Sequence, residues 1–109
     1  MEQKQEPRIE TADQEFVVKF KKAYKFEGKI VSEVDLSGLA DLTGQDMINA
    51  EKYLSSMGTV SATPELTLGY CFFIASVSSD KPIEFFKTLT PNDAIKVKNR
   101  VTSFFYSEG

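Results

Sequence analysis

The sequence contains no histidine and no tryptophan, and it has a single cysteine, Cys71, among its 109 residues. Without histidine the chain lacks the commonest general base, the usual base of a serine hydrolase and the commonest zinc ligand. One cysteine cannot form an intramolecular disulfide, and it cannot complete a structural zinc site. These absences argue against an enzyme and against a bound metal or other cofactor.

The chain also lacks an excess of basic residues and any long apolar run. Its net charge is −3, whereas nucleic-acid binding draws most of its affinity from lysine and arginine side chains that neutralise phosphates. No stretch approaches the roughly 20 apolar residues that cross a bilayer, and the polar start does not resemble a signal peptide. We therefore expect a cytosolic protein that binds neither nucleic acid nor membrane.

Charge is distributed unevenly along the chain. Residues 36–80 carry five acidic residues against one basic residue, and residues 81–109 carry five basic against three acidic residues. Two solvated helix faces of opposite charge explain this pattern. The alternative is a complementary contact between copies of the chain, which would make the protein self-associate.

Three local patterns have a catalytic or metal-binding interpretation, and each has a simpler one. Cys71 has apolar neighbours, which favours a buried packing cysteine over a nucleophile. Ser78 and Lys81 have the spacing of serine–lysine acyl transferases, but the companion motifs are missing. Residues 41–46 lack the alternating acids and the closing glutamate of a calcium loop, and helix capping explains them better.

The chain is predicted to form a single α+β domain. Residues 1–14 are polar and charged, which predicts a flexible N-terminal arm, so the domain covers residues 15–109. Apolar and charged side chains alternate over residues 15–36, which predicts a β-hairpin with strands near 15–25 and 29–36.

The length of the loop decides how the two strands pair. A two-residue loop would place Phe20 opposite Asp35 and mix the apolar and polar faces. A three-residue loop over residues 26–28 places Phe20 opposite Val34, with Gly28 at a left-handed position that suits glycine. We therefore predict the three-residue loop.

Helical spacing of apolar residues predicts three main α-helices that pack as a small bundle after the hairpin. They cover about 44–57, 64–78 and 91–105, and a short helical turn over residues 83–87 precedes the last of them. Each main helix is predicted to begin at a threonine cap: Thr43, Thr63 or Thr90. The middle helix is apolar around most of its girth, which favours a central position or one shared with a partner.

Adjacent aromatic residues and the basic last helix provide candidates for a partner-binding surface. Neighbours on a helix are about 100° apart, so the members of an aromatic group cannot all face one core. We expect one member of each group to point outward or into a second contact, while closure of the core is the alternative; the basic residues would steer a partner's approach. The candidates are Phe85, Phe86, Phe104, Phe105, Tyr106, Lys96, Lys98 and Arg100.

Several short segments resemble those of tail assembly chaperones from long-tailed phages and prophages of Gram-positive bacteria. They are Tyr24-Lys25-Phe26-Glu27-Gly28-Lys29, Asp35-Leu36-Ser37-Gly38-Leu39, Leu42-Thr43-Gly44-Gln45-Asp46, Pro64-Glu65-Leu66, Phe85-Phe86-Lys87 and Asp93-Ala94-Ile95-Lys96-Val97. The similarity spans residues 16–106, and its motifs are structural, with no catalytic signature.

The resemblance implies that the protein acts in the host bacterial cytoplasm and is absent from the mature virion. Chaperones of that family bind the long helical tape measure protein, keep it soluble and help the tail-tube protein to polymerise around it. They also tend to self-associate. The family has no ligand-contact motif that transfers residue by residue to this chain.

Two other functions stay open from the sequence. A phage structural adaptor, such as a head–tail or tail completion protein, would remain with purified particles, whereas a chaperone would not. A small nucleic-acid-binding regulator would bind DNA in a salt-dependent manner, which the acidic composition disfavours.

Overall fold

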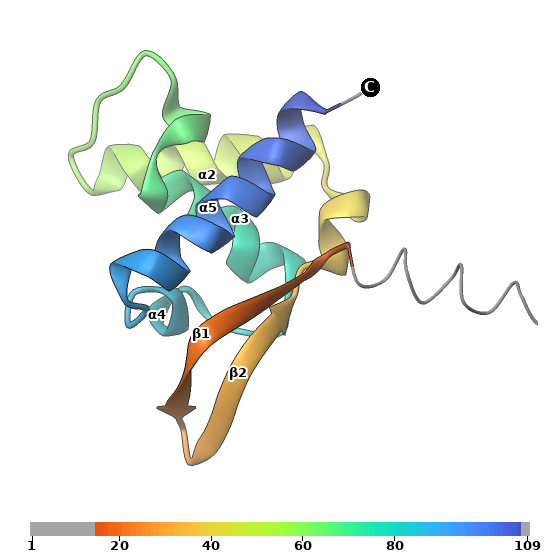
Figure 1. The fold of residues 1–109 in the computed structure, drawn as a ribbon. Helices are drawn as coiled ribbons and strands as arrows, with labels where there is room; N and C mark the ends of the chain where they lie inside the picture. The colour runs from red at the N-terminus through yellow and green to blue at the C-terminus, as the bar shows by residue number, and fades with distance from the viewer. Residues whose placement is uncertain (1–14, 108–109) are drawn as a thin grey trace, which may run out of the picture.

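The computed structural model describes residues 15–107, which form a β-hairpin beside a group of helices (Figure 1). The elements in chain order are β1 (Val17–Phe26), β2 (Lys29–Asp35), the 3-10 helix η1 (Ser37–Asp41), α2 (Gly44–Ser56), the 3-10 turn η2 (Pro64–Leu66), α3 (Leu68–Ser78), the short α4 (Ile83–Phe86) and α5 (Pro91–Tyr106). The α+β class predicted from the sequence is confirmed, with the hairpin first and the helices after it. The predicted flexible arm, residues 1–14, lies outside the described residues.

The caps of α2 explain where that helix begins and ends. The Thr43 hydroxyl accepts a hydrogen bond from the Asp46 amide, and the Asp46 carboxylate accepts one from the Thr43 amide, which together form a capping box. At the other end the Thr59 amide donates to the Leu54 carbonyl at 3.0 Å, and Gly58 has a φ of +78°. Glycine is favoured at such an ending because it adopts a positive φ without strain.

The middle helix begins later than the sequence predicts. Pro64 starts the single turn of η2, and the Thr63 side chain makes no capping hydrogen bond there. Thr67 has an extended backbone that interrupts the helical path, and its side chain then caps α3 by accepting from the Tyr70 amide at 3.3 Å. The pair Thr63-Pro64 therefore marks the start of a 3-10 turn, and the α-helix itself begins four residues after Pro64, at Leu68.

The hairpin loop has two residues, so the predicted three-residue loop is wrong. Glu27 and Gly28 form the turn, with φ values of +52° and +81°, and positive φ at both positions is typical of the tight turns that match strand twist. Near the open end of the hairpin, Val34 pairs with Val18 and not with Phe20.

A bulge in β1 reconciles the short loop with an apolar inner face. Residues 20–23 of β1 lie opposite the single residue Ser32 of β2, so the register shifts between the two ends of the hairpin. The shift allows Val31 and Val34, which are three residues apart on β2, both to be buried, while Ile30 is 70% exposed. The prediction failed because it assumed one uninterrupted register along the whole hairpin.

α3 lies at the centre of the helices (Figure 1), and the core surrounds it and extends to the inner face of the hairpin. α3 packs against α2, α4, α5 and η1, and most of its side chains are buried, as its apolar girth indicates. Gly38 of η1 approaches the end of α3 so closely that an added Cβ would lie 2.6 Å from the Ser78 carbonyl oxygen. Glycine is therefore required at this crossing of two backbones.

Candidate functional site

Phe85 and Phe86, two of the candidate partner-binding residues, are both completely buried. The Phe85 ring lies among three aromatic rings of β1, with centroids 5.3–6.1 Å away. On the other side of α4, the Phe86 ring stacks on Phe72 of α3 at 5.9 Å. Neither member of this pair points outward, because the single turn of α4 is covered by the hairpin and by α3. The two rings instead contact two different neighbours, which is the second contact that the helical spacing allows.

The second aromatic group, at the end of α5, is divided between core and surface. Phe104 packs near Phe16 with ring centroids 6.4 Å apart, and Phe105 packs near Tyr70 at 6.2 Å. Both are partly buried against the core. Tyr106, by contrast, is 63% exposed, so it is the outward member that the helical spacing predicts.

Two basic residues of α5 attach that helix to β1 and to the residues just before the strand. The Lys96 ammonium donates to the Lys19 carbonyl at 3.1 Å, and Nε of Arg100 donates to the Glu15 carbonyl at 2.6 Å. The Arg100 guanidinium also lies over the ring of Phe16, 5.1 Å from its centroid. These side chains therefore contact the fold itself, and their role in steering a partner stays a prediction.

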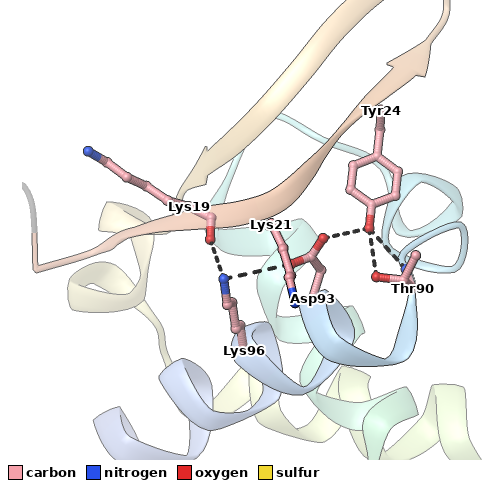
Figure 2. A network of polar contacts seen from close by, with 6 residues as sticks. All are labelled: Lys19, Lys21, Tyr24, Thr90, Asp93 and Lys96. Atoms are coloured by element: carbon pink, nitrogen blue, oxygen red, sulfur yellow. Dashed lines mark hydrogen bonds and ion pairs between the residues drawn. The ribbon is translucent and has the colours of Figure 1, made fainter.

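Asp93 was not among the sequence candidates, yet it is a charged side chain that is fully buried. Its carboxylate accepts hydrogen bonds from the Lys21 amide and the Tyr24 hydroxyl, both at 2.7 Å, and the Lys96 ammonium lies 3.8 Å away (Figure 2). The Tyr24 hydroxyl in turn accepts from the Thr90 amide at 3.0 Å. Figure 2 shows how these groups join the start of α5 to β1.

This network lowers the pKa of Asp93 and satisfies a backbone amide in the bulge of β1. Burial alone would raise the pKa of the Asp93 carboxyl, but the hydrogen bonds from Lys21, Tyr24 and the Lys22 amide, with the charge of Lys96, hold the pKa below its usual value. Lys21 lies in the bulge, and Asp93 provides the acceptor for its amide. All of these partners belong to the fold itself, which favours a structural role for Asp93 over a catalytic one.

Cys71 is buried, as its apolar neighbours in the sequence predict. Its thiol donates to the Glu65 carbonyl at 3.4 Å, and burial raises the pKa of the thiol to about 11 although the nearby charge of Lys98 acts in the opposite direction. A thiol with this pKa is protonated at neutral pH and is a poor nucleophile. Within residues 15–107, no group of three His, Cys, Asp or Glu side chains is placed to hold a metal ion.

Large apolar side chains are exposed where the end of α5 meets the connection between α2 and α3. The Tyr106 hydroxyl donates to the Glu65 carboxylate at 2.6 Å, which holds Tyr106 beside η2. Leu66 and Leu68, which follow in the chain, are 41% and 43% exposed, and Val60, in the same connection, is 97% exposed. Val60, Leu66, Leu68 and Tyr106 are referred to below as the apolar end.

A hollow of about 290 Å³ lies beside the apolar end, between α2 and the connection that leaves it. Its lining combines apolar atoms, three hydroxyl groups and one carboxylate. The residues that line it are Glu51, Leu54, Ser55, Thr59, Val60, Ser61 and Pro64. Local sequence patterns did not indicate the hollow, because it depends on the path of an irregular connection.

Two carboxylates, those of Glu51 and Glu65, lie at or near the hollow. Burial, followed by the charges of Glu51 and Glu65, raises the pKa of Tyr70 to about 12. The hydrogen bond from Tyr106 lowers the pKa of Glu65, so that carboxylate is charged at neutral pH. This end of the molecule therefore combines exposed apolar side chains with two carboxylates.

Comparisons with protein-family models, with curated proteins and with solved structures give no match for the chain. Among residues 15–107, no helix is both long and apolar enough to cross a membrane. Function is therefore inferred from the sequence segments and from the surface of this chain alone.

Proposed function

We propose that the protein is a phage tail assembly chaperone, which binds the tape measure protein and keeps it soluble while the tail is assembled. The observation that carries this proposal is the apolar end, where three large apolar side chains around the connection between α2 and α3 are exposed and Tyr106, also exposed, is bonded to that connection through Glu65. Exposed apolar patches on small proteins mark partner surfaces. The six sequence segments that resemble tail assembly chaperones support the tape measure protein as the partner.

The physical basis is the binding of an amphipathic helix. A long helical partner presents apolar side chains at the spacing i, i+3, i+4 and i+7, which can lie on a compact apolar surface. The apolar end is small, so one contact of this kind is weak. Several copies of the chaperone on one tape measure protein would add such contacts by avidity, and the tail-tube protein would displace them as it polymerises.

Of the sequence candidates, Tyr106 is the residue best placed for this contact. Its phenol ring is exposed, and its hydroxyl is held by Glu65, so little conformational entropy is lost when a partner packs against it. The buried pair Phe85 and Phe86 stabilises the chaperone itself. Lys98 is partly buried on α5 and contributes charge to the surroundings of this surface.

Co-expression in bacteria tests the proposal. Tape measure protein produced alone is expected to aggregate, and co-expression with this chain is expected to keep it in the soluble fraction as a complex. The variant Leu66→Ser, Leu68→Ser, Tyr106→Ser should lose this effect, because it removes the apolar contacts. The matched control Ile30→Ser, Ile48→Ser removes exposed apolar side chains elsewhere and should keep it.

Two results would contradict the proposal. The first is tape measure protein that stays insoluble with the wild-type chain. The second is a wild-type chain that remains with purified phage particles, which is expected of a structural adaptor.

A further inference from the structure

The hollow beside the apolar end exists because the chain leaves α2 abruptly. Gly58, with a φ of +78°, and the Thr59 amide, bound to the Leu54 carbonyl at 3.0 Å, turn the chain back at the end of the helix. A space of about 290 Å³ remains between helix and connection. The space is large enough to accept one long side chain.

The lining of the hollow distinguishes between apolar, anionic and cationic side chains. Glu51 is the one charged residue among the seven that line it. An apolar group pressed against this carboxylate would remove water from a charge without replacing its hydrogen bonds, and an anion would be repelled. A lysine or arginine side chain fits, because its stem can pack on Leu54 and Pro64 while its head binds the Glu51 carboxylate and the hydroxyl groups.

The surroundings extend this preference beyond the hollow itself. Glu65 stays ionised because the Tyr106 hydroxyl donates to it and lowers its pKa. The charges of Glu51 and Glu65 both act on Tyr70, so the two carboxylates lie near the same part of the molecule. Their negative charge attracts a cationic group.

The apolar end determines what kind of segment delivers the cation. Val60 belongs both to the lining of the hollow and to the apolar end, and Leu66 lies two residues beyond Pro64, which also lines the hollow. A segment that places a cation on Glu51 therefore lies against Val60, and apolar side chains next to that cation can reach Leu66. An amphipathic helix with a lysine or arginine at the edge of its apolar stripe meets both requirements.

We infer that the hollow and the apolar end together bind an amphipathic helix of the partner, with a lysine or arginine side chain beside Glu51 and apolar side chains on Val60 and Leu66. The inference rests on the proposed function in one respect only, that the helix belongs to the tape measure protein.

Binding of a designed peptide tests the chemistry of the hollow without that assumption. The probe is a fluorescently labelled amphipathic peptide of about 18 leucine and lysine residues, long enough to form a helix. Its control has glutamate in place of every lysine, and fluorescence polarisation gives the dissociation constants. The leucine–lysine peptide is expected to bind at least about tenfold more tightly than the leucine–glutamate peptide. Equal affinity for the two peptides would overturn the inference.

Matched variants of the protein separate the hollow from general electrostatic attraction. Glu51→Gln should weaken binding of the leucine–lysine peptide about threefold to fivefold, as expected for a partly exposed ion pair. Val60→Ser should weaken it about threefold through lost apolar contact. The controls Glu33→Gln and Ile30→Ser remove an exposed carboxylate and an exposed apolar side chain from the hairpin and should change nothing. Equal effects at Glu51 and Glu33 would contradict a specific site.

The outcomes also distinguish this inference from the proposed function. In one outcome the wild-type chain keeps tape measure protein soluble, and the Glu51→Gln variant binds both that protein and the peptide as tightly as the wild type. The hollow is then not the binding site, and the proposed function stands. If the peptide binds through Glu51 but tape measure protein is not kept soluble, the hollow stands and the named partner is wrong.

Discussion

Asp93→Asn measures how much the buried network contributes to stability. The Lys21 amide donates to one carboxylate oxygen of Asp93 and the Tyr24 hydroxyl to the other. In asparagine an NH2 group replaces one of these oxygens, so one of the two donors loses its acceptor. Hydrogen bonds to a charged group contribute about 1.5–3 kcal/mol, against about 0.5–1.5 kcal/mol for neutral ones. The Tyr24 hydroxyl can turn to the Thr90 side-chain oxygen, 3.1 Å away, and recover part of the loss. We therefore expect the free energy of unfolding to fall by about 1–3 kcal/mol.

Urea unfolding at pH 7, followed by far-UV circular dichroism, measures this loss. Asp93→Ala should cost about 2–4 kcal/mol, because both donors then lack their acceptor. The control Asp41→Asn changes an exposed acid and should stay within about 0.5 kcal/mol of the wild type.

A double-mutant cycle with Tyr24→Phe tests the contact itself. The coupling energy between Tyr24→Phe and Asp93→Asn is expected to exceed about 0.5 kcal/mol, since the two side chains share a hydrogen bond at 2.7 Å. The assigned role would be refuted if the two changes in unfolding free energy added to within about 0.3 kcal/mol. It would also be refuted if the Asp93→Asn variant were as stable as the Asp41→Asn control.

Three further predictions concern the stability of the fold. Because the folded-state pKa of Asp93 is lowered, the stability from its charge is present above the unfolded pKa of about 3.9 and is lost as pH falls through the folded value. The difference in unfolding free energy between the wild type and Asp93→Asn should therefore shrink below about pH 4; a difference unchanged with pH would contradict this. Gly38→Ala should cost about 1–3 kcal/mol in thermal melts, since its Cβ would meet a backbone oxygen at 2.6 Å. Gly44→Ala, with nothing within 4 Å of the new Cβ, should be nearly neutral, and similar melts for both variants would exclude the predicted clash. Phe86→Ala should cost about 3–5 kcal/mol and Phe73→Ala less, because Phe73 is partly exposed; equal losses in urea unfolding would show that the two sites are equally buried.

The parts of the fold that depend on local signals could be predicted from the sequence. The start of α2 follows from Thr43 and Asp46, which bond to each other across three residues, and its end follows from Gly58. The register of the hairpin could not be predicted in this way. It depends on a bulge whose Lys21 amide is bound by Asp93, a residue 72 positions further along the chain, and no pattern within the strands contains that information.

The candidate site was predicted only in part, for a similar reason. Helical spacing showed that the aromatic residues of α5 diverge, and Tyr106 is the outward one. Phe85 and Phe86 also diverge, but neither is exposed, because a single helical turn between two packed layers can bury both of its sides. The hollow at Glu51 depends on an irregular connection, and only three-dimensional coordinates reveal such a shape.

The resistance of the complex to salt tests the chaperone proposal most directly. Tagged tape measure protein is co-expressed with this chain, captured, and washed at increasing ionic strength. We predict that the chain stays bound at about 0.5 M salt, where charge attraction is screened within a few ångströms and apolar contacts are little affected. A chain that is released before that point, or that never elutes with the tape measure protein, would contradict binding through the apolar end.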